Sequence, residues 1–393
     1  MKKFILKSAL VLLPFTAIYL MNHYLYQPGM GDLIRLGYMY HRTVKLNPIL
    51  KKKAPRIQYT LVTELGKTSR RSFTILTIGD SFSEQGPFGF KNFLADGEQQ
   101  TVLHTDMHLT NGNQVQTLSG MFNGDFFDSV KVKYVVLQII ERAFVQRIKH
   151  CNPEVVINAG QWVPQMGGKD MSHHAYRMDA NGNPAEPVLP SRRINMASVG
   201  ESVWKEVFTD AVIKTPFTNL QYLYTCKPAF SKTYRVKTHC DSLFTDAPPY
   251  ILFYEEDVDN LVWNNNQQLI SESNQFLNQM QDSLSSRGIQ LIVLISPDKY
   301  DLYYSCLDKT QGFQEPLLFQ HLDRLEKRYL YVSLKPRFMK NGKVMKDVYY
   351  YGDTHWTILG AKIAAEAVKE EIRRFENPVQ PNGNRKLLQD EQE

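Results

Sequence analysis

The chain has 393 residues, of which 43% are hydrophobic and 12% aromatic, so it is long and apolar enough to bury a sizeable core. Its formal net charge is +6, but residues 1–53 hold nine of the 46 Lys and Arg residues and only one of the 40 Asp and Glu residues. The other 340 residues therefore carry 37 positive against 39 negative side chains, which argues against a nucleic-acid-binding body.

Residues 1–26 combine a basic start with an apolar run. Lys2, Lys3 and Lys7 lie at or before the start of the run, which extends from about Ser8 to Met21, and tyrosines follow it. This pattern is typical of an export signal, and no small-residue cleavage motif follows it. We expect an uncleaved signal anchor in the inner (cytoplasmic) membrane that places the rest of the chain on the periplasmic side. A cleaved signal peptide and a buried helix remain as alternatives.

Residues 27–72 are of mixed polarity and are interpreted as a stalk. From residue 73 to residue 376 short apolar runs alternate with helical patterns. The predicted strands are 74–78, 134–140, 290–295 and 329–334, and the clearest predicted helices are 257–286 and 356–375. Continuous Val, Ile and Leu runs are typical of strands buried on both faces. The alternation predicts an α/β fold with a doubly wound parallel sheet flanked by helices.

Two segments interrupt this order. Residues 151–256 are rich in Pro, Gly, Asn and aromatic residues and are interpreted as a large insertion, because they are too long for one structureless loop. Residues 377–393 have little to bury and are predicted to be a disordered tail.

Four cysteines are scattered along the chain without a C-x-x-C pair: Cys151, Cys226, Cys240 and Cys306. In an exported protein they would form up to two disulfides, with three connectivities, while free buried thiols are the alternative. No metal site or cofactor is expected, since no Cys and His spacing typical of zinc is found.

A serine follows the first predicted strand at a sharp corner, in the stretch TILTIGDSFSEQG. Ligands of a doubly wound sheet bind at the carboxyl ends of the strands, so Ser81 is placed where a nucleophile would act. Helix capping by Asp80 and Ser81 is the structural alternative. A nucleophilic serine also needs a base to take its proton.

The stretch VYYYGDTHWTILGAKIAAEAV, near the C-terminus, offers that base. Asp353 and His355 lie on a short loop before the last helix. A neutral histidine takes a hydroxyl proton while a carboxylate fixes its tautomer, so the pair fits a Ser/His/Asp triad with Ser81. A capping Asp beside a surface His is the alternative for this segment alone.

GDSF after a strand, together with DTHW leading into a G-A-x-x-x-A helix, resembles the SGNH (GDSL-type) hydrolase superfamily. The pattern is most similar to the SGNH-like domains of alginate and cell-wall polysaccharide O-acetylation proteins. VVLQIIERAF and LIVLISPDKYDLYY resemble two further segments of that group, so the resemblance covers residues 74–145 and 258–372.

The resemblance implies further site residues. It places Arg142 and Lys299, with Tyr304 beside it, near the site, where Arg142 would position the serine loop or the substrate; structural ion pairs are the alternative. The glycine and asparagine that bind the oxyanion in most SGNH esterases are not clearly matched. Asn123 and Gly124 are candidates, with simple turn residues as the alternative.

Two features depart from relatives of this kind. The Asp-x-His spacing follows the acetylation group rather than the Asp-x-x-His of SGNH esterases. The serine precedes DTHW, whereas in the alginate proteins it follows, so the domain resembles a permuted arrangement.

The resemblance implies extracytoplasmic transfer of an acetyl group to glycan hydroxyls through an acyl-enzyme. The acceptor would be an extracellular polysaccharide, and a membrane-bound acyltransferase would supply the acyl group. A carbohydrate acetylesterase and a non-catalytic, membrane-tethered glycan-binding or assembly factor are the alternatives.

Overall fold

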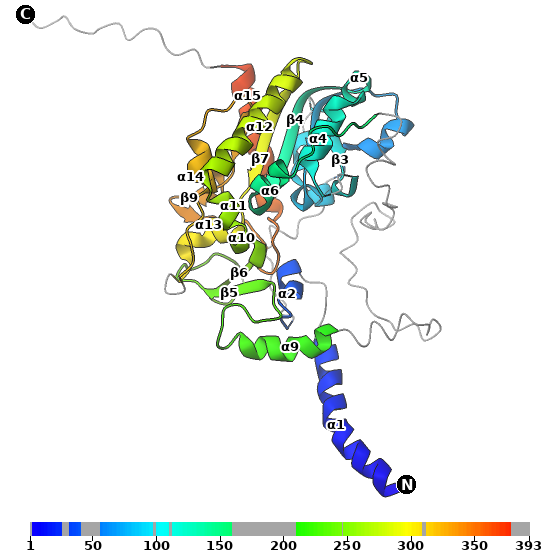
Figure 1. Ribbon diagram of the computed structural model, residues 1–393, viewed down its shortest axis with the longest axis vertical. Helices are drawn as coiled ribbons and strands as arrows, with labels where there is room; N and C mark the ends of the chain where they lie inside the picture. Colours follow the sequence, from blue (N-terminus) through cyan, green and yellow to red (C-terminus); the bar gives the residue numbers. More distant parts are fainter. Residues whose placement is uncertain are drawn as a thin grey trace, which may run out of the picture.

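The computed structural model describes residues 2–25, 31–40, 56–96, 100–109, 112–158, 210–245, 247–308 and 312–378. The body is built around a six-stranded sheet with the order β1-β3-β2-β4-β7-β8, in which every neighbouring pair is parallel. Its strands are β1 (Thr60–Leu61), β2 (Ser72–Ile78), β3 (Val102–Thr105), β4 (Lys131–Ile140), β7 (Gln290–Ser296) and β8 (Leu330–Ser333). The predicted parallel α/β sheet is confirmed (Figure 1).

Helices cover both faces of the sheet. One face carries α3 (Phe90–Ala95) and α15 (Ile358–Glu376). The other carries α4 (Gln114–Asn123), α5 (Phe126–Ser129), α6 (Phe144–Lys149), α12 (Gln267–Ser285) and α14 (Leu318–Asp323). Successive residues of β4 alternate between the two cores: Val136 packs with α3 and α15, and Val135 with α4 and α12. Burial on both faces explains why the strands read as continuous apolar runs.

Smaller elements gather at the carboxyl ends of the strands. They are α2 (Asp32–Leu36), α9 (Asp210–Gln221), the antiparallel pair β5 (Thr233–Lys237) and β6 (Tyr250–Tyr254), α10 (Glu255–Asp259), α11 (Leu261–Asn264), α13 (Lys299–Tyr303) and the hairpin β9 (Met339–Lys340) and β10 (Lys343–Val344). Figure 1 shows α2, α9, β5 and β6 together beyond one end of the sheet, below it in this view. A separate small core joins them, with Leu33, Met39, Tyr222, Leu252 and Tyr351 buried.

The helix predicted at 257–286 is divided into three, α10, α11 and α12. The second of the two breaks falls on the run of asparagines before α12, where the side chain of Asn266 accepts a hydrogen bond from the Leu269 N–H at 3.1 Å and caps the new helix. The final predicted helix begins in the same way, because the Thr357 hydroxyl accepts from the Leu359 N–H at 3.2 Å.

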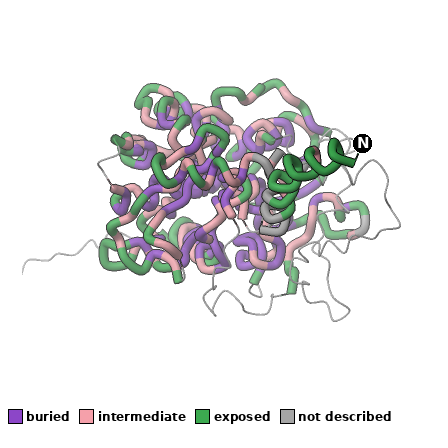
Figure 2. The backbone as a smooth tube through the Cα atoms, turned by 90° about the horizontal axis from the view of Figure 1, so that it is seen from below, coloured by how far each residue is buried: buried purple, intermediate pink, exposed green. Residues whose placement is uncertain are grey.

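The N-terminal helix α1 (Lys2–Leu25) projects away from the body (Figure 1) and is largely exposed (Figure 2). Across the described residues, no helix is both long enough and apolar enough to span a bilayer. The signal anchor predicted at 1–26 is therefore not supported. Residues 31–40 and 56–72, from the segment interpreted as a stalk, contain α2, β1 and the first residue of β2. Residues 159–209 of the predicted insertion and 379–393 of the predicted tail lie outside the described residues.

Candidate active site

Ser81 lies just beyond the carboxyl end of β2, at the start of the short 3-10 turn η3 (Ser81–Ser83). Asp80 fixes this corner, because its carboxylate accepts from the Phe82 N–H at 3.1 Å, from the Ile140 N–H at 2.8 Å and from Arg147 at 2.9 Å. Gly79 is required for packing: a Cβ there would lie 1.9 Å from the Ser83 Oγ. The capping role considered for Asp80 is thus present, and it leaves the Ser81 side chain free to face the site.

Gln138, fully buried on β4, supports the turn from below. Its Oε1 accepts from the Asp80 N–H at 3.0 Å and from the Ser83 hydroxyl at 2.9 Å, while its Nε2 donates to the Ser296 Oγ at 3.0 Å. A buried amide with all these partners rigidifies its surroundings. The serine turn is therefore tied to two neighbouring strands, β4 and β7.

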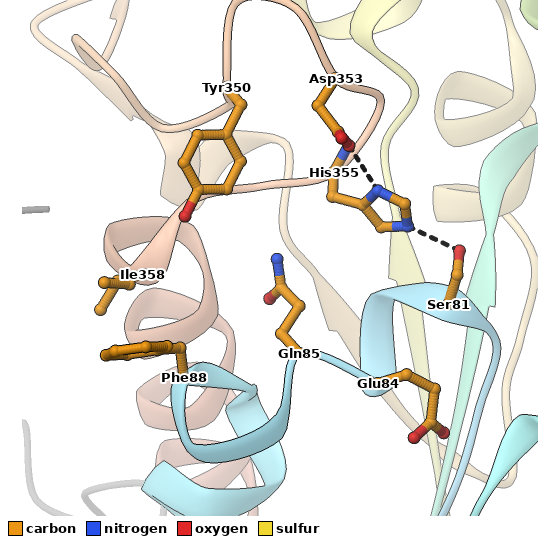
Figure 3. A pocket seen from close by; sticks show the side chains of 8 residues that line it. All are labelled: Ser81, Glu84, Gln85, Phe88, Tyr350, Asp353, His355 and Ile358. Atoms are coloured by element: carbon orange, nitrogen blue, oxygen red, sulfur yellow. Dashed lines mark hydrogen bonds and ion pairs between the residues drawn. The ribbon is translucent and has the colours of Figure 1, made fainter. Parts of the chain in front are cut away.

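The structure brings Ser81, His355 and Asp353 together. The His355 Nε2 lies 2.7 Å from the Ser81 Oγ, and its Nδ1 lies 2.5 Å from the Asp353 Oδ1 (Figure 3). The same Asp353 oxygen accepts the His355 backbone N–H at 2.9 Å. Asp353 as acceptor sets the tautomer with the proton on Nδ1, which leaves Nε2 to accept the serine proton.

The surroundings of His355 and Asp353 favour the charged forms of both side chains. Burial lowers the pKa of His355, but the hydrogen bond and charge of Asp353, with the charge of Asp32, raise the pKa above its ordinary value overall. Burial alone would raise the pKa of Asp353, yet its bonds to His355 lower it to about 2. Phe82 packs against the imidazole with ring centroids 4.8 Å apart. The site can hold an imidazolium beside a carboxylate, as a proton-accepting base requires.

A cavity of about 330 Å³ opens beside the serine. Its lining combines the three triad residues with polar and apolar side chains: Ser81, Glu84, Gln85, Phe88, Tyr350, Asp353, His355 and Ile358 (Figure 3). The Gln85 amide donates to the Trp356 carbonyl and accepts from the Trp356 indole N–H, each at 2.7 Å. Trp356 is thereby fixed as buried support for the wall of the cavity.

Arg142 lies near the site without lining this cavity. Its guanidinium bonds Asp257 and Asp298, each at 3.1 Å, and stacks over the Tyr254 ring at 5.4 Å. Burial opposes its charge, but these carboxylates keep its pKa above the ordinary value. The structural ion pair considered for Arg142 is present, and its charge also acts on His355.

Lys299 holds the loop that carries Asp353. Its buried Nζ donates to the carbonyls of Tyr350, Tyr351 and Asp353 at 2.9, 2.8 and 3.2 Å. Burial lowers the pKa of Lys299 to about 7, although neighbouring carboxylates partly offset this. Lys299 therefore acts on the backbone of the site. Tyr304, expected beside it, donates to the Phe313 carbonyl at 3.1 Å.

The structure does not bring Asn123 and Gly124 to Ser81. The N-terminal end of α4 lies near the carboxyl end of β4, where Gln114 donates to the Gln138 carbonyl at 2.9 Å. Asn123 is the last residue of this helix, roughly 13 Å further along at 1.5 Å per residue. Its amide donates to the carbonyls of Pro153 and Val155, and a Cβ at Gly124 would lie 2.0 Å from the Ile157 oxygen. Both residues anchor the chain at 153–157.

The sequence analysis did not predict two acidic residues that lie near the site. Glu84 lines the cavity and bonds His104 at 2.9 Å and Lys91 at 3.0 Å. Asp32 reaches the Asp353–His355 loop from 321 positions earlier in the chain. Glu84 follows Ser81 by three residues, which could have drawn attention to it, but no local pattern connects Asp32 to the loop.

Asp32, Asp353 and His355 offer potential metal-ligand atoms that all lie within 4.8 Å of one another. Hydrogen bonds already engage these groups: Asp353 accepts from His355, and Asp32 accepts from the Thr354 N–H at 2.7 Å. The hydrogen bonds of His355 join it to Asp353 and Ser81, as in a Ser/His/Asp triad.

One disulfide joins Cys240 to Cys306, and Cys151 and Cys226 are free. The four cysteines were expected to form up to two disulfides or to remain as free thiols, and the structure has one disulfide and two free thiols. Cys306 follows α13, so the bridge connects the element that carries Lys299 to the chain after β5.

Two comparisons with known proteins point to the same group of acetylation proteins. Residues 246–392 match the family model described as the SGNH hydrolase-like domain of acetyltransferase AlgX. A probable alginate O-acetylase AlgJ from Pseudomonas putida is 28% identical over 110 residues, which cover 28% of this chain and 29% of the relative. No solved structure matches. The predicted resemblance to SGNH-like polysaccharide O-acetylation proteins is confirmed. The family match contains Asp353 and His355, while Ser81 lies outside it.

Proposed function

We propose that this protein transfers an acetyl group to glycan hydroxyls through a Ser81-bound acyl-enzyme. One observation carries the proposal: Ser81, His355 and Asp353 form a continuous hydrogen-bonded chain, with contacts of 2.7 and 2.5 Å, at the wall of a cavity. The match to the acetyltransferase family model supports acetyl as the acyl group, and the similarity to a probable alginate O-acetylase supports a polysaccharide as the acceptor class.

In the first half-reaction, the Ser81 Oγ attacks the carbonyl carbon of an acetyl ester while the His355 Nε2 takes its proton. Asp353 holds the Nδ1 proton and stabilises the imidazolium. The tetrahedral intermediate collapses, His355 returns the proton to the departing alcohol, and acetyl-Ser81 remains. The Ser81 N–H, at the first position of a 3-10 turn, is suited to bind the oxyanion because the turn itself does not use it.

In the second half-reaction, a glycan hydroxyl enters the cavity and gives its proton to His355. Its oxygen attacks the acetyl carbonyl, Ser81 leaves as an alkoxide, and His355 returns the proton to it. Water in place of the glycan would make the same residues an acetylesterase. Tyr350, Phe88 and Ile358, on the cavity wall opposite the triad, provide the apolar surface on which a sugar ring would pack (Figure 3).

We further propose that the reaction takes place outside the cytoplasm, where a membrane-bound acyltransferase supplies the acetyl group. The Cys240–Cys306 disulfide supports an oxidising compartment. The lysines at the N-terminus, followed by an apolar run from about Ser8 to Met21, are typical of an export signal and also support this location. Fractionation of cells that produce the full chain, with a protease-accessibility assay on spheroplasts, tests the location: protection of the body from protease would contradict export.

Hydrolysis of a chromogenic acetyl ester by the full chain tests the triad. The full chain is needed because residues 31–40 contact the catalytic loop. Ser81→Ala and His355→Ala are each expected to lower kcat about 10³-fold or more. Ser72→Ala, at the exposed start of the same strand, and His150→Ala, on the surface, are matched controls and are expected to retain full activity.

Acetylated and plain oligosaccharides then separate the two acceptors. Mass spectrometry should show acetyl gained by the plain oligosaccharide when an acetyl-ester donor is present. Release of free acetate alone, from every glycan tried, would assign the esterase reaction. Equal activity of wild type and both triad variants would defeat the triad assignment.

A further inference from the structure

The N-terminal segment 31–40 forms part of the active site. Its helix α2 (Asp32–Leu36) begins against the loop 352–355, which carries Asp353 and His355. This segment precedes Ser81, lies outside the residues matched by the acetyltransferase family model, and contains none of the residues assigned to the triad.

The Asp32 carboxylate holds Thr354, the residue between the two triad members on this loop. Its Oδ1 accepts from the Thr354 N–H at 2.7 Å, and its Oδ2 accepts from the Thr354 hydroxyl. The same Oδ2 lies 3.9 Å from the His355 Nδ1. Thr354 is buried and the Asp32 side chain is 21% exposed, so these bonds are partly shielded from water.

Backbone groups of the same turn hold the other side of the loop. The Asp32 N–H donates to the second oxygen of Asp353 at 3.2 Å. The next two N–H groups, of Leu33 and Ile34, donate to the Gly352 carbonyl at 3.1 and 3.2 Å. Gly31 permits this approach: its φ is +84°, and a Cβ there would lie 2.1 Å from the Gly352 oxygen.

The segment is itself anchored in the small core beside β5 and α9. Leu33 is fully buried, and its carbonyl accepts from the Thr233 hydroxyl at 2.8 Å. Asn219 of α9 donates to the Tyr38 carbonyl at 2.8 Å. The contacts of Asp32 are therefore made from a fixed platform, and that platform belongs to the region that interrupts the sheet pattern.

We propose that Asp32 is a positioning residue of this site: with the N–H groups of its turn, it holds the 352–355 loop so that His355 faces Ser81. The proposal rests on the function proposed above. Asp353 uses one oxygen for both the backbone N–H and the ring Nδ1 of His355, and it is held at the other oxygen by the Asp32 N–H. Removal of the Asp32 carboxylate would free Thr354, and the imidazole would lose its fixed direction.

Kinetics of the full chain with a chromogenic acetyl ester test this role. Asp32→Asn keeps the size of the side chain and an oxygen for the Thr354 N–H, but loses the acceptor for the Thr354 hydroxyl and the charge. Because misplacement of a reacting group by about 1 Å costs about 100-fold, we expect kcat to fall about 10- to 100-fold with KM within about two-fold. Asp128→Asn, in an exposed ion pair with Arg287, is the matched control and is expected to behave as wild type.

The pH profile separates positioning from a general structural effect. Burial and the charge of Arg142 lower the pKa of His355, while Asp353 and Asp32 raise it. Burial also lowers the pKa of Lys299, which donates to the carbonyls of the same loop, to about 7. Loss of the Asp32 charge should therefore move the acid limb of kcat/KM to lower pH. ¹⁵N NMR of the His355 ring assigns this limb and does not depend on turnover.

Thr354 provides a second pair of variants in case Asp32→Asn does not fold. Thr354→Val removes the hydroxyl that Asp32 accepts from and should lower kcat, while Thr354→Ser should restore it.

The outcomes are distinct for the two proposals. Wild-type kcat and an unshifted His355 pKa in Asp32→Asn, while Ser81→Ala is inactive, would overturn the role of Asp32 and leave the triad in place. Full activity of Ser81→Ala would overturn the proposed function.

Discussion

Replacement of Glu84 by glutamine should destabilise the protein far more than its place at the rim of a cavity suggests. The Glu84 carboxylate accepts from the His104 Nε2 at 2.9 Å, from the Met107 N–H at 3.0 Å and from the Lys91 Nζ at 3.0 Å. The side chains of Lys91 and His104 are 1% and 0% exposed. The Glu84→Gln substitution would keep the shape of the side chain and leave the Lys91 ammonium buried without its counter-charge.

The loss in the free energy of unfolding can be estimated in two ways. Breaking a buried ion pair by removal of one partner costs about 3–5 kcal/mol. Lys91 can instead release its proton, and for a group with an ordinary pKa of 10.5 this costs about 5 kcal/mol at pH 7, at about 1.4 kcal/mol per pH unit. The Tyr59 ring, 4.8 Å from the Lys91 Nζ, stabilises part of the remaining charge. We expect a loss of about 3 kcal/mol in the free energy of unfolding, near the lower estimate.

Equilibrium unfolding in urea at pH 7, followed by far-UV circular dichroism, measures this loss. Asp282→Asn is the matched control, because its pair with Arg328 spans 2.9 Å but is about half exposed on both sides, and it should cost about 0–1 kcal/mol. The pKa of Glu84 is lowered in the folded state, because the charges of His104 and Lys91 outweigh burial. Its stabilisation is therefore present above the unfolded pKa of 4.5 and is lost as the pH falls below it. A loss below about 1 kcal/mol at pH 7, or a difference from wild type that does not shrink in acid, would refute the reasoning.

Two further predictions follow from the site and the disulfide. In the proposed reaction His355 acts as a neutral base, and its pKa is raised above 6.5, so kcat/KM should rise with pH through a midpoint above 6.5. A midpoint at or below that value would contradict the contacts with Asp353. The stabilisation that accompanies this raised pKa is present below the unfolded value and is lost as the pH rises through the folded one. The Cys240–Cys306 bridge joins residues 66 positions apart, so its removal by a double Ser substitution should cost about 4 kcal/mol. Thermal unfolding checks this against Cys151→Ser, and equal melting temperatures for the two variants would count against the estimate.

The fold of the central sheet was predictable because burial on both faces leaves a strong local signal. β2, β4, β7 and β8 all fall within the predicted apolar runs or within a few residues of them. β3 was missed, since it has only four residues and the sequence around it shows no alternation of apolar and polar residues. The start of α12 within the predicted 257–286 helix depended on the Asn266 cap, which competes with an otherwise continuous apolar stripe.

The triad was predictable for a different reason. In a parallel sheet all carboxyl ends lie at one edge, so a serine after β2 and a histidine before the last helix have a common meeting place. The supporting residues carry no such signal. Lys299 acts on three backbone carbonyls, and Asp32 acts on a threonine 322 positions away, so neither role follows from residue type or spacing.

The order of the triad along the chain does not determine its geometry. Ser81 is held by β2 and β4 through Asp80 and Gln138, while His355 is held by Lys299, the first residue of α13 just after β7, and by Asp32. Each support is a contact at the same edge of the sheet, where the strands β2, β4 and β7 end. A chain in which the serine segment precedes the histidine segment can therefore build the same site as one with the reverse order, provided that the strands keep their positions in the sheet. The loop that carries His355 must still be held in place. In this chain the segment 31–40, which was first interpreted as part of a stalk, holds that loop through Asp32.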